Sequence, residues 1–114
     1  MTLFAMTILA ALSMLESGDN DRAIGNAGEV SRYQVMPDVW RLHHGKDPTN
    51  PVEAKRVATQ ILMHRIASFQ VMRHRTPTPF ETYLLWRCPG RVSNPTKRAA
   101  ETAERFANLV QAKP

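Results

Sequence analysis

Residues 16 to 40 read ESGDNDRAIGNAGEVSRYQVMPDVW and join three kinds of sequence. A carboxylate ends an apolar helical pattern, a loop rich in Gly, Asn and Asp follows, and an aromatic and Gln segment leads to the next helix signal. Gly, Asn and Asp favour turns because they tolerate left-handed backbone angles or bond to their own main chain. We therefore expect a helix end, a polar loop, and a short extended segment over Val30 to Val35 that could pair into a small hairpin.

The sequence before Glu16 predicts a helix from Leu3 to Leu15. Its apolar residues recur at spacings of three and four, as on a helix with one buried face: Ala5, Ile8, Leu9, Leu12 and Leu15. Glu16 follows Leu12 by four positions, so its side chain starts from the same stripe. Partial burial and the negative end of the helix both favour the neutral acid over the carboxylate. A neutral acid suits general acid catalysis, whereas the plainer alternative is a solvated Glu in a last helical turn.

The segment around Glu16 resembles the catalytic segment of the lysozyme-like superfamily, closest to soluble lytic transglycosylases and goose-type lysozymes. The matching residues are Glu16-Ser17, Asn20, Ala23, Gly25, Gly28 and Tyr33-Gln34-Val35-Met36-Pro37. In that superfamily a Glu-Ser pair closes the catalytic helix, and a hydrophobic-Gln-hydrophobic-Met-Pro element lines the sugar cleft. This chain has Ser31-Arg32 where Gly-Leu is usual.

A second segment with the same resemblance is YLLWRCPGRV, residues 83 to 92, where the family has an aromatic-Asn-Ala-Gly-Pro stretch. Here Arg87 stands where the family usually has Asn. The resemblance implies a mainly α fold of the α+β lysozyme-like type, with about five helices around a long central helix and a small loop or β-hairpin segment beside the catalytic helix. It also implies a single lysozyme-like catalytic domain over residues 1–114.

The resemblance further implies peptidoglycan glycan strands as the substrate. Glu16 would be the general acid at the β-1,4 bond between N-acetylmuramic acid and N-acetylglucosamine. A lytic transglycosylase needs no second carboxylate, because the sugar's own 6-hydroxyl attacks. An inverting hydrolase needs one to activate water, and Glu29 is the preferred candidate ahead of Asp19 and Asp21. The alternative for Glu29 is a loop carboxylate paired with Arg32 or solvent.

Five further residues are predicted to bind substrate: Ser17, Tyr33, Gln34, Tyr83 and Trp86. Ser17 and Gln34 match family positions, and an amide can both donate to and accept from an acetamido group. Four of them have a structural alternative. Ser17 could satisfy carbonyls at the helix end, Gln34 could be a buried structural amide, and the aromatic residues Tyr83 and Trp86 could pack in the core.

The chain has 114 residues, with 15 Lys and Arg against 10 Asp and Glu, a formal net charge of +5 and a pI near 10.0. This balance favours an anionic polymer as the partner. Nucleic acid is not expected, because no basic arm or aromatic-basic RNA motif is present. The single cysteine, Cys88, excludes an internal disulfide, and an inert thiol is favoured over a nucleophile. No metal-ligand spacing is found, so neither metal nor cofactor is expected.

Location and assembly are constrained less directly. The substrate implies a periplasmic or extracellular protein, yet no export signal is recognisable, because the apolar opening lacks a basic start and a cleavage site. That opening is also too short for a comfortable membrane span, so stable membrane insertion is not expected. We expect a monomer. Two other classes remain open: an inactive lysozyme-like protein that binds cell wall, and a basic helical module that binds nucleic acid or protein.

Local signals place the remaining helices. Pro37 and Gly45 bracket a short helix over residues 37 to 44. Asn50-Pro51 opens a long central helix that runs to about His74, and Thr78 begins a capping box for the next. Asn94-Pro95 opens the last helix, whose small-residue stripe predicts close packing against the central helix. The basic run Arg73 to Arg75 could contact an anionic ligand or complement the helix dipole.

Overall fold

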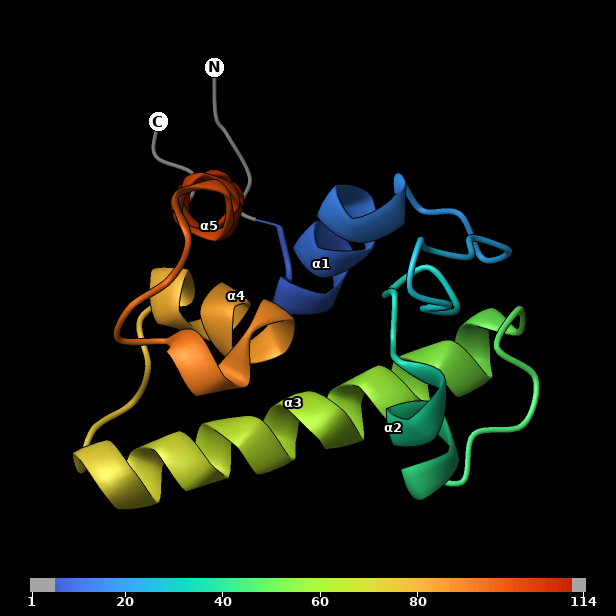
Figure 1. Cartoon of the computed structure of the whole chain (residues 1–114), viewed down its shortest axis with the longest axis horizontal. Coiled ribbons are helices and arrows are strands. Elements are labelled where there is room, and N and C mark those ends of the chain that lie inside the picture. The colour runs from blue at the N-terminus through green and yellow to red at the C-terminus, as the bar shows by residue number, and fades with distance from the viewer. Residues whose placement is uncertain (1–5, 112–114) are drawn as a thin grey trace. The chain divides into compact units, whose positions relative to one another are not determined.

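The computed structural model describes residues 6–111 and is mainly helical, which confirms the predicted class (Figure 1). The α-helices of the described residues are, in chain order, α1 (Ile8–Ser17), α2 (Pro37–Leu42), α3 (Pro51–Arg73), α4 (Pro79–Arg87) and α5 (Lys97–Val110). A short 3-10 helix, η1 (Pro89–Arg91), follows α4. The predicted start of the first helix at Leu3 lies outside the described residues, but the prediction is wrong for Met6 and Thr7, which precede α1; Thr7 Oγ1 accepts a hydrogen bond from Ala10 N at 3.2 Å and so acts at the helix start. Within residues 6–111, no helix has both the length and the apolar character that a membrane crossing requires.

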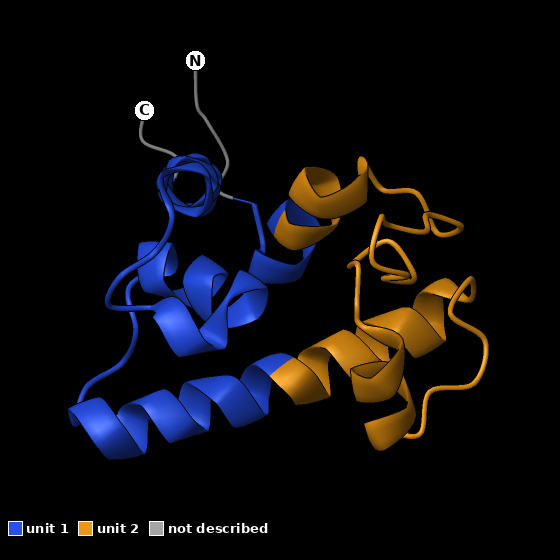
Figure 2. Ribbon diagram, in the orientation of Figure 1, with its two compact units in different colours: residues 1–11, 62–114 blue, residues 12–61 orange. Residues whose placement is uncertain are grey.

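The chain divides into two compact units (Figure 2). Unit 1 comprises residues 1–11 and 62–114, and unit 2 comprises residues 12–61. Helices α1 and α3 each supply residues to both units, whereas α4 and α5 belong to unit 1 and α2 belongs to unit 2. The single domain over 1–114 stays a prediction.

In unit 1, α5 packs against α4. The rings of Tyr83 and Phe106 lie 5.7 Å apart between centroids, and Ala103 is fully buried one turn before Phe106. The predicted close packing of the last helix against the central helix is therefore wrong, because α4 is its main partner. The physical reason is that five consecutive residues of α4, Thr82 to Trp86, are buried. A helix buried on every side must pack against more than one neighbouring element, and α5 is one of them.

The starts of the long helices follow their capping residues, with one correction. Asn50 Oδ1 accepts hydrogen bonds from the main-chain N of Val52 and Glu53, at 2.9 and 3.1 Å. Thr78 caps α4 in a complete capping box with Glu81. The last helix begins after Asn94-Pro95 rather than at it: Thr96 is the cap. Asn94 instead belongs to the turn after η1, where its main-chain N donates to the carbonyl oxygen of Arg91 at 3.1 Å.

Unit 2 contains the polar loop and two isolated antiparallel bridges, Ile24 with Val30 and Val30 with Val35. The predicted extended segment over Val30 to Val35 is instead a tight turn whose two ends pair. Ser31 and Gln34 adopt positive φ angles of 70° and 55°, which a continuous strand would not allow. The buried apolar residues of this unit are Leu12, Tyr33, Val35, Trp40, Ala54, Val57, Ala58 and Ile61.

The short helix α2 begins at Pro37 as predicted and ends at Leu42, two residues early. His44 then takes a positive φ of 57° and turns the chain back. Gly45 lies against the indole ring of Trp40, so close that a Cβ atom there would overlap the ring. Glycine therefore fits this position because of a tight approach to a buried side chain, in addition to its place after a helix end.

Candidate functional site

Glu16 is the penultimate residue of α1 and is half-buried, as the apolar spacing predicted. The chain leaves the helix through Gly18 and Asp19, both with φ of 64°. Ser13 Oγ donates to Asp19 Oδ1 at 2.6 Å, which fixes this exit from inside the helix. The carboxyl group of Glu16 is thus presented from a helix end whose following turn is held by its own hydrogen bonds.

Ser17 connects that helix end to the polar loop. Its Oγ lies 2.8 Å from the carbonyl oxygen of Arg32 and 3.3 Å from that of Ser13, and it accepts a hydrogen bond from Asn20 N at 3.0 Å. A hydroxyl has one proton, so the shorter contact to Arg32 is the stronger of the two it can donate. The alternative role for Ser17, satisfying a carbonyl at the helix end, accounts only for the longer contact to Ser13. The contacts to Arg32 and Asn20 hold the polar loop beside the end of α1.

Arg32 forms an ion pair with Asp21 rather than with Glu29. Its Nε lies 2.6 Å from Asp21 Oδ1, and its Nη2 lies 3.0 Å from Asp21 Oδ2. The Arg32 guanidinium lowers the pKa of the Asp21 carboxyl, and the carboxylate raises the pKa of Arg32 in return. Of the two alternatives to a catalytic Glu29, a pair with Arg32 or a solvated carboxylate, the pair with Arg32 is not formed, because Asp21 already binds the guanidinium through both carboxylate oxygens.

The side chains of Glu29 and Gln34 both lie close to the Cα atom of Gly25. A Cβ atom on Gly25 would lie 2.5 Å from Gln34 Oε1 and 2.8 Å from Glu29 Oε2. Glu29 Oε1 accepts a hydrogen bond from the main-chain N of Ala27 at 2.7 Å. Glycine thus permits two predicted site residues to share one small surface of the loop.

The amide of Gln34 is committed to its own loop. Its Nε2 donates to the carbonyl oxygen of Ser31 at 2.9 Å and to that of Ala23 at 3.3 Å. These two bonds use both amide hydrogens, so Gln34 holds the turn as a structural amide. Only Oε1 of Gln34 could then bind an acetamido group, as a hydrogen-bond acceptor.

The three aromatic residues predicted to bind substrate are core side chains. Tyr33, in unit 2, exposes 5% of its surface, and burial raises the pKa of its hydroxyl. In unit 1, Tyr83 exposes 4% and Trp86 exposes 7%. Arg65 lies over the Trp86 ring, 5.9 Å from its centroid. Rings this buried cannot offer an open face to a sugar, so core packing accounts for their positions.

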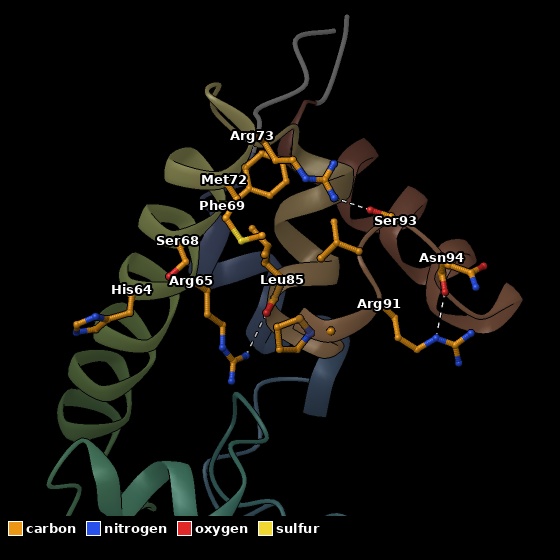
Figure 3. A pocket seen from close by; sticks show the side chains of 13 residues that line it. His64, Arg65, Ser68, Phe69, Met72, Arg73, Leu85, Arg91, Ser93 and Asn94 are labelled. Atoms are coloured by element: carbon orange, nitrogen blue, oxygen red, sulfur yellow. Dashed lines mark hydrogen bonds between the residues drawn. The ribbon is translucent and has the colours of Figure 1, made fainter.

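Unit 1 contains a pocket of about 560 Å³ that none of the predicted site residues lines (Figure 3). Its walls come from the second half of α3, from Leu85 of α4, and from η1 with the turn after it. The lining residues are His64, Arg65, Ser68, Phe69, Met72, Arg73, Leu85, Pro89, Gly90, Arg91, Val92, Ser93 and Asn94. The signal that could have found it is the arrangement of Arg65, Phe69, Met72 and Arg73 at helical spacing on α3.

The surroundings of Cys88 do not favour a reactive thiol. Burial raises the pKa of the Cys88 thiol, which disfavours the thiolate that a nucleophile would need. Among residues 6–111, no cluster of three or more His, Cys, Asp or Glu side chains could hold a metal ion.

The chain matches no protein-family model, no curated protein and no solved structure.

Proposed function

We propose that this protein cleaves the β-1,4 bond between N-acetylmuramic acid and N-acetylglucosamine in peptidoglycan, with Glu16 as the general acid. The observation that carries the proposal is the place of Glu16: half-buried in the last turn of α1, next to Ser17, whose hydroxyl holds the Arg32 carbonyl of the polar loop at 2.8 Å. This is consistent with the Glu-Ser pair that closes the catalytic helix in the lysozyme-like superfamily, whose fold we propose for the chain.

The position suits proton donation. The last carbonyl groups of a helix have no intrahelical partner and carry partial negative charge, so a carboxyl group beside them is favoured in its neutral form. A neutral Glu16 would give its proton to the glycosidic oxygen as positive charge develops at the sugar ring. The remaining carboxylate would then face that charge.

The second step has two routes. Asp21 is engaged by Arg32, and Asp19 accepts a hydrogen bond from Ser13 at 2.6 Å. Glu29 accepts a hydrogen bond from Ala27 N within the loop, whereas the bond to Ser13 holds Asp19 against α1, so Glu29 stays the preferred carboxylate to activate water in a hydrolase. If the 6-hydroxyl of the sugar attacks instead, Glu16 takes its proton and Glu29 has no catalytic part.

The substrate implies that the protein works in the periplasm or outside the cell. The net charge of +5 favours association with an anionic wall polymer. A monomer is sufficient for the proposed chemistry, since both Glu16 and Glu29 belong to unit 2 of one chain.

The test is mass analysis of soluble products released from purified peptidoglycan by the parent, by Glu16→Gln and by Glu104→Gln. Glu104 is an exposed residue of α5, so its variant removes the same charge far along the chain and should match the parent. We expect muropeptides from the parent and the control, and none from Glu16→Gln at an unchanged melting temperature.

The products decide between the two routes. Anhydro-muropeptides would establish a transglycosylase, and Glu29→Gln should then retain activity. Reducing-end muropeptides would establish a hydrolase, and Glu29→Gln should then lose most of its activity. If the parent releases nothing across a pH series, or if Glu16→Gln equals the parent, the proposal is wrong. Wall binding without cleavage would then favour the inactive wall-binding protein.

A further inference from the structure

We propose that the pocket of unit 1 binds an amphipathic oxyanion, that is, a carboxylate or phosphate group carried on an apolar body. The proposal does not depend on Glu16, because the pocket contains none of the residues assigned to glycan cleavage. It rests on three arginines held by hydrogen bonds, on a pocket lining without Asp or Glu among the described residues, and on an apolar floor.

Each of the three arginines is held by a neutral partner. Arg65 Nη1 donates to the carbonyl oxygens of Leu85 and Trp86, at 3.1 and 2.7 Å. Arg73 Nη2 donates to Ser93 Oγ across the pocket, and Arg91 Nε donates to the carbonyl oxygen of Asn94 at 3.1 Å (Figure 3). A guanidinium has five N–H groups, so each arginine keeps donors for a ligand. The partners fix the side chains in place beforehand, which lowers the entropy cost of binding.

No carboxylate neutralises these arginines within the described part of the chain. None of the 13 lining residues is Asp or Glu. The three ion pairs found in residues 6–111 use other arginines: Arg32, Arg56 and Arg75. Arg65 is half-buried, and burial lowers the pKa of its guanidinium, because the charged form loses part of its hydration there. An anion in the pocket would compensate that lost solvation.

The floor of the pocket is apolar. Phe69 and Leu85 are buried at 6% exposure each, and Val92 and the exposed Met72 extend the apolar surface toward the opening. The Arg73 guanidinium lies 5.5 Å from the Phe69 ring centroid, so charge and apolar surface are adjacent. A bare anion would leave this floor in contact with water. A volume of about 560 Å³ accommodates an apolar body together with a charged group.

The first probe is 1-anilinonaphthalene-8-sulfonate, an aromatic body with an oxyanion, compared with N-phenyl-1-naphthylamine, which has the same rings and no charge. Both are titrated by fluorescence into the full chain. We expect the sulfonate to bind about tenfold more tightly than the neutral compound, because only the sulfonate can accept charge-assisted hydrogen bonds from the arginines. Equal affinity would show that apolar contact alone drives binding and would overturn the proposal.

Competition identifies the chemistry of the ligand. Octanoate and octyl phosphate should displace the sulfonate probe, and the one that does so at lower concentration indicates the preferred head group. Octanol and inorganic phosphate should displace the probe poorly, because octanol has no anionic group and inorganic phosphate has no apolar chain. Displacement by inorganic phosphate as effective as that by octyl phosphate would contradict the role of the apolar floor.

Variants locate the site. Arg73→Gln combined with Arg91→Gln should weaken binding of the sulfonate probe at least about tenfold. Arg105→Gln combined with Arg98→Gln removes the same charge from exposed positions of α5 outside the pocket and should change affinity less than about twofold. Glu16→Gln should bind like the parent, which separates this proposal from glycan cleavage. If the pocket variant binds as the parent does, or if the α5 variant weakens binding equally, the pocket is not the site.

Discussion

Arg75 and Glu81 form a bidentate ion pair, in which Nη1 meets Oε1 and Nη2 meets Oε2, both at 2.7 Å. The same carboxylate completes the capping box of α4: Thr78 N donates to Glu81 Oε1 at 3.0 Å, and Glu81 N donates to Thr78 Oγ1 at 3.1 Å. Together, with the Arg75 bond as the largest cause, these contacts lower the pKa of Glu81 from 4.5 to about 2. One side chain thus fixes both the start of α4 and the segment that follows α3.

Glu81→Gln should make the protein less stable at neutral pH, and the difference from the parent should shrink in acid. The folded-state pKa is depressed, so the stabilisation is fully present above about pH 4.5 and is lost as pH falls toward about 2. Arg75 is 48% exposed, so solvent screening leaves an expected effect of about 1–2 kcal/mol. Urea unfolding at several pH values measures it. Glu104→Gln is the matched control, and a difference that did not vary with pH would contradict the assignment.

Gly45→Ala should destabilise the fold by about 1–3 kcal/mol, because the added methyl group overlaps the buried Trp40 indole. Gly90→Ala is the control, since nothing lies within 4 Å of a Cβ there. Chemical denaturation of both variants, with Trp fluorescence as the signal, makes the comparison. Equal stabilities would mean that the packing of Gly45 on Trp40 is looser than described.

Ser17→Ala should cost about 1–2 kcal/mol, because it removes the bond to the Arg32 carbonyl and the acceptor for Asn20 N. Thr59→Ala provides the control, since Thr59 Oγ1 donates to the carbonyl oxygen of Lys55 within the same helix, α3, and so ties no loop to it. Amide hydrogen exchange gives a second readout, in which the loop amides of unit 2 should exchange faster in Ser17→Ala. Unchanged exchange in the loop would refute the idea that Ser17 ties it to α1.

Phe106→Leu should destabilise unit 1 by roughly 1–2 kcal/mol, and Phe106→Ala by roughly 3–5 kcal/mol, because the ring is fully buried against Tyr83. Met63→Ala, at a position that is 65% exposed, should change stability by less than about 0.5 kcal/mol. Thermal unfolding measures all three. A small effect of Phe106→Leu would show that α5 contributes little to the core.

Helix existence and most helix starts could be predicted from the sequence. Pro37, Asn50 and Thr78 each mark a first turn, because a cap or a proline acts on main-chain groups only a few residues away. The start of α5 was misplaced for the same local reason: Asn94-Pro95 and Thr96 both carry start signals, and only the latter takes the cap geometry, with φ of −66° and ψ of 159°.

The candidate glycosidase site was only partly predictable. The place of Glu16 at a helix end followed from apolar spacing. The hydrogen-bond partners of Gln34, Glu29 and Arg32 could not be predicted, because a long polar side chain in a loop can reach several nearby groups. Arg32 forms its ion pair with Asp21 rather than with Glu29, and this pairing depends on the conformation of the whole loop.

By itself the sequence determined the mainly helical class, the starts of most helices and the position of Glu16 on α1, because these depend on interactions within a few residues. Only the tertiary structure decided that α5 packs on α4, that Tyr83 and Trp86 are core residues, and that Arg73 meets Ser93 in a shared pocket. Such contacts join residues distant in the chain. Their partners are chosen by which apolar faces must be buried together, and local spacing does not specify that choice.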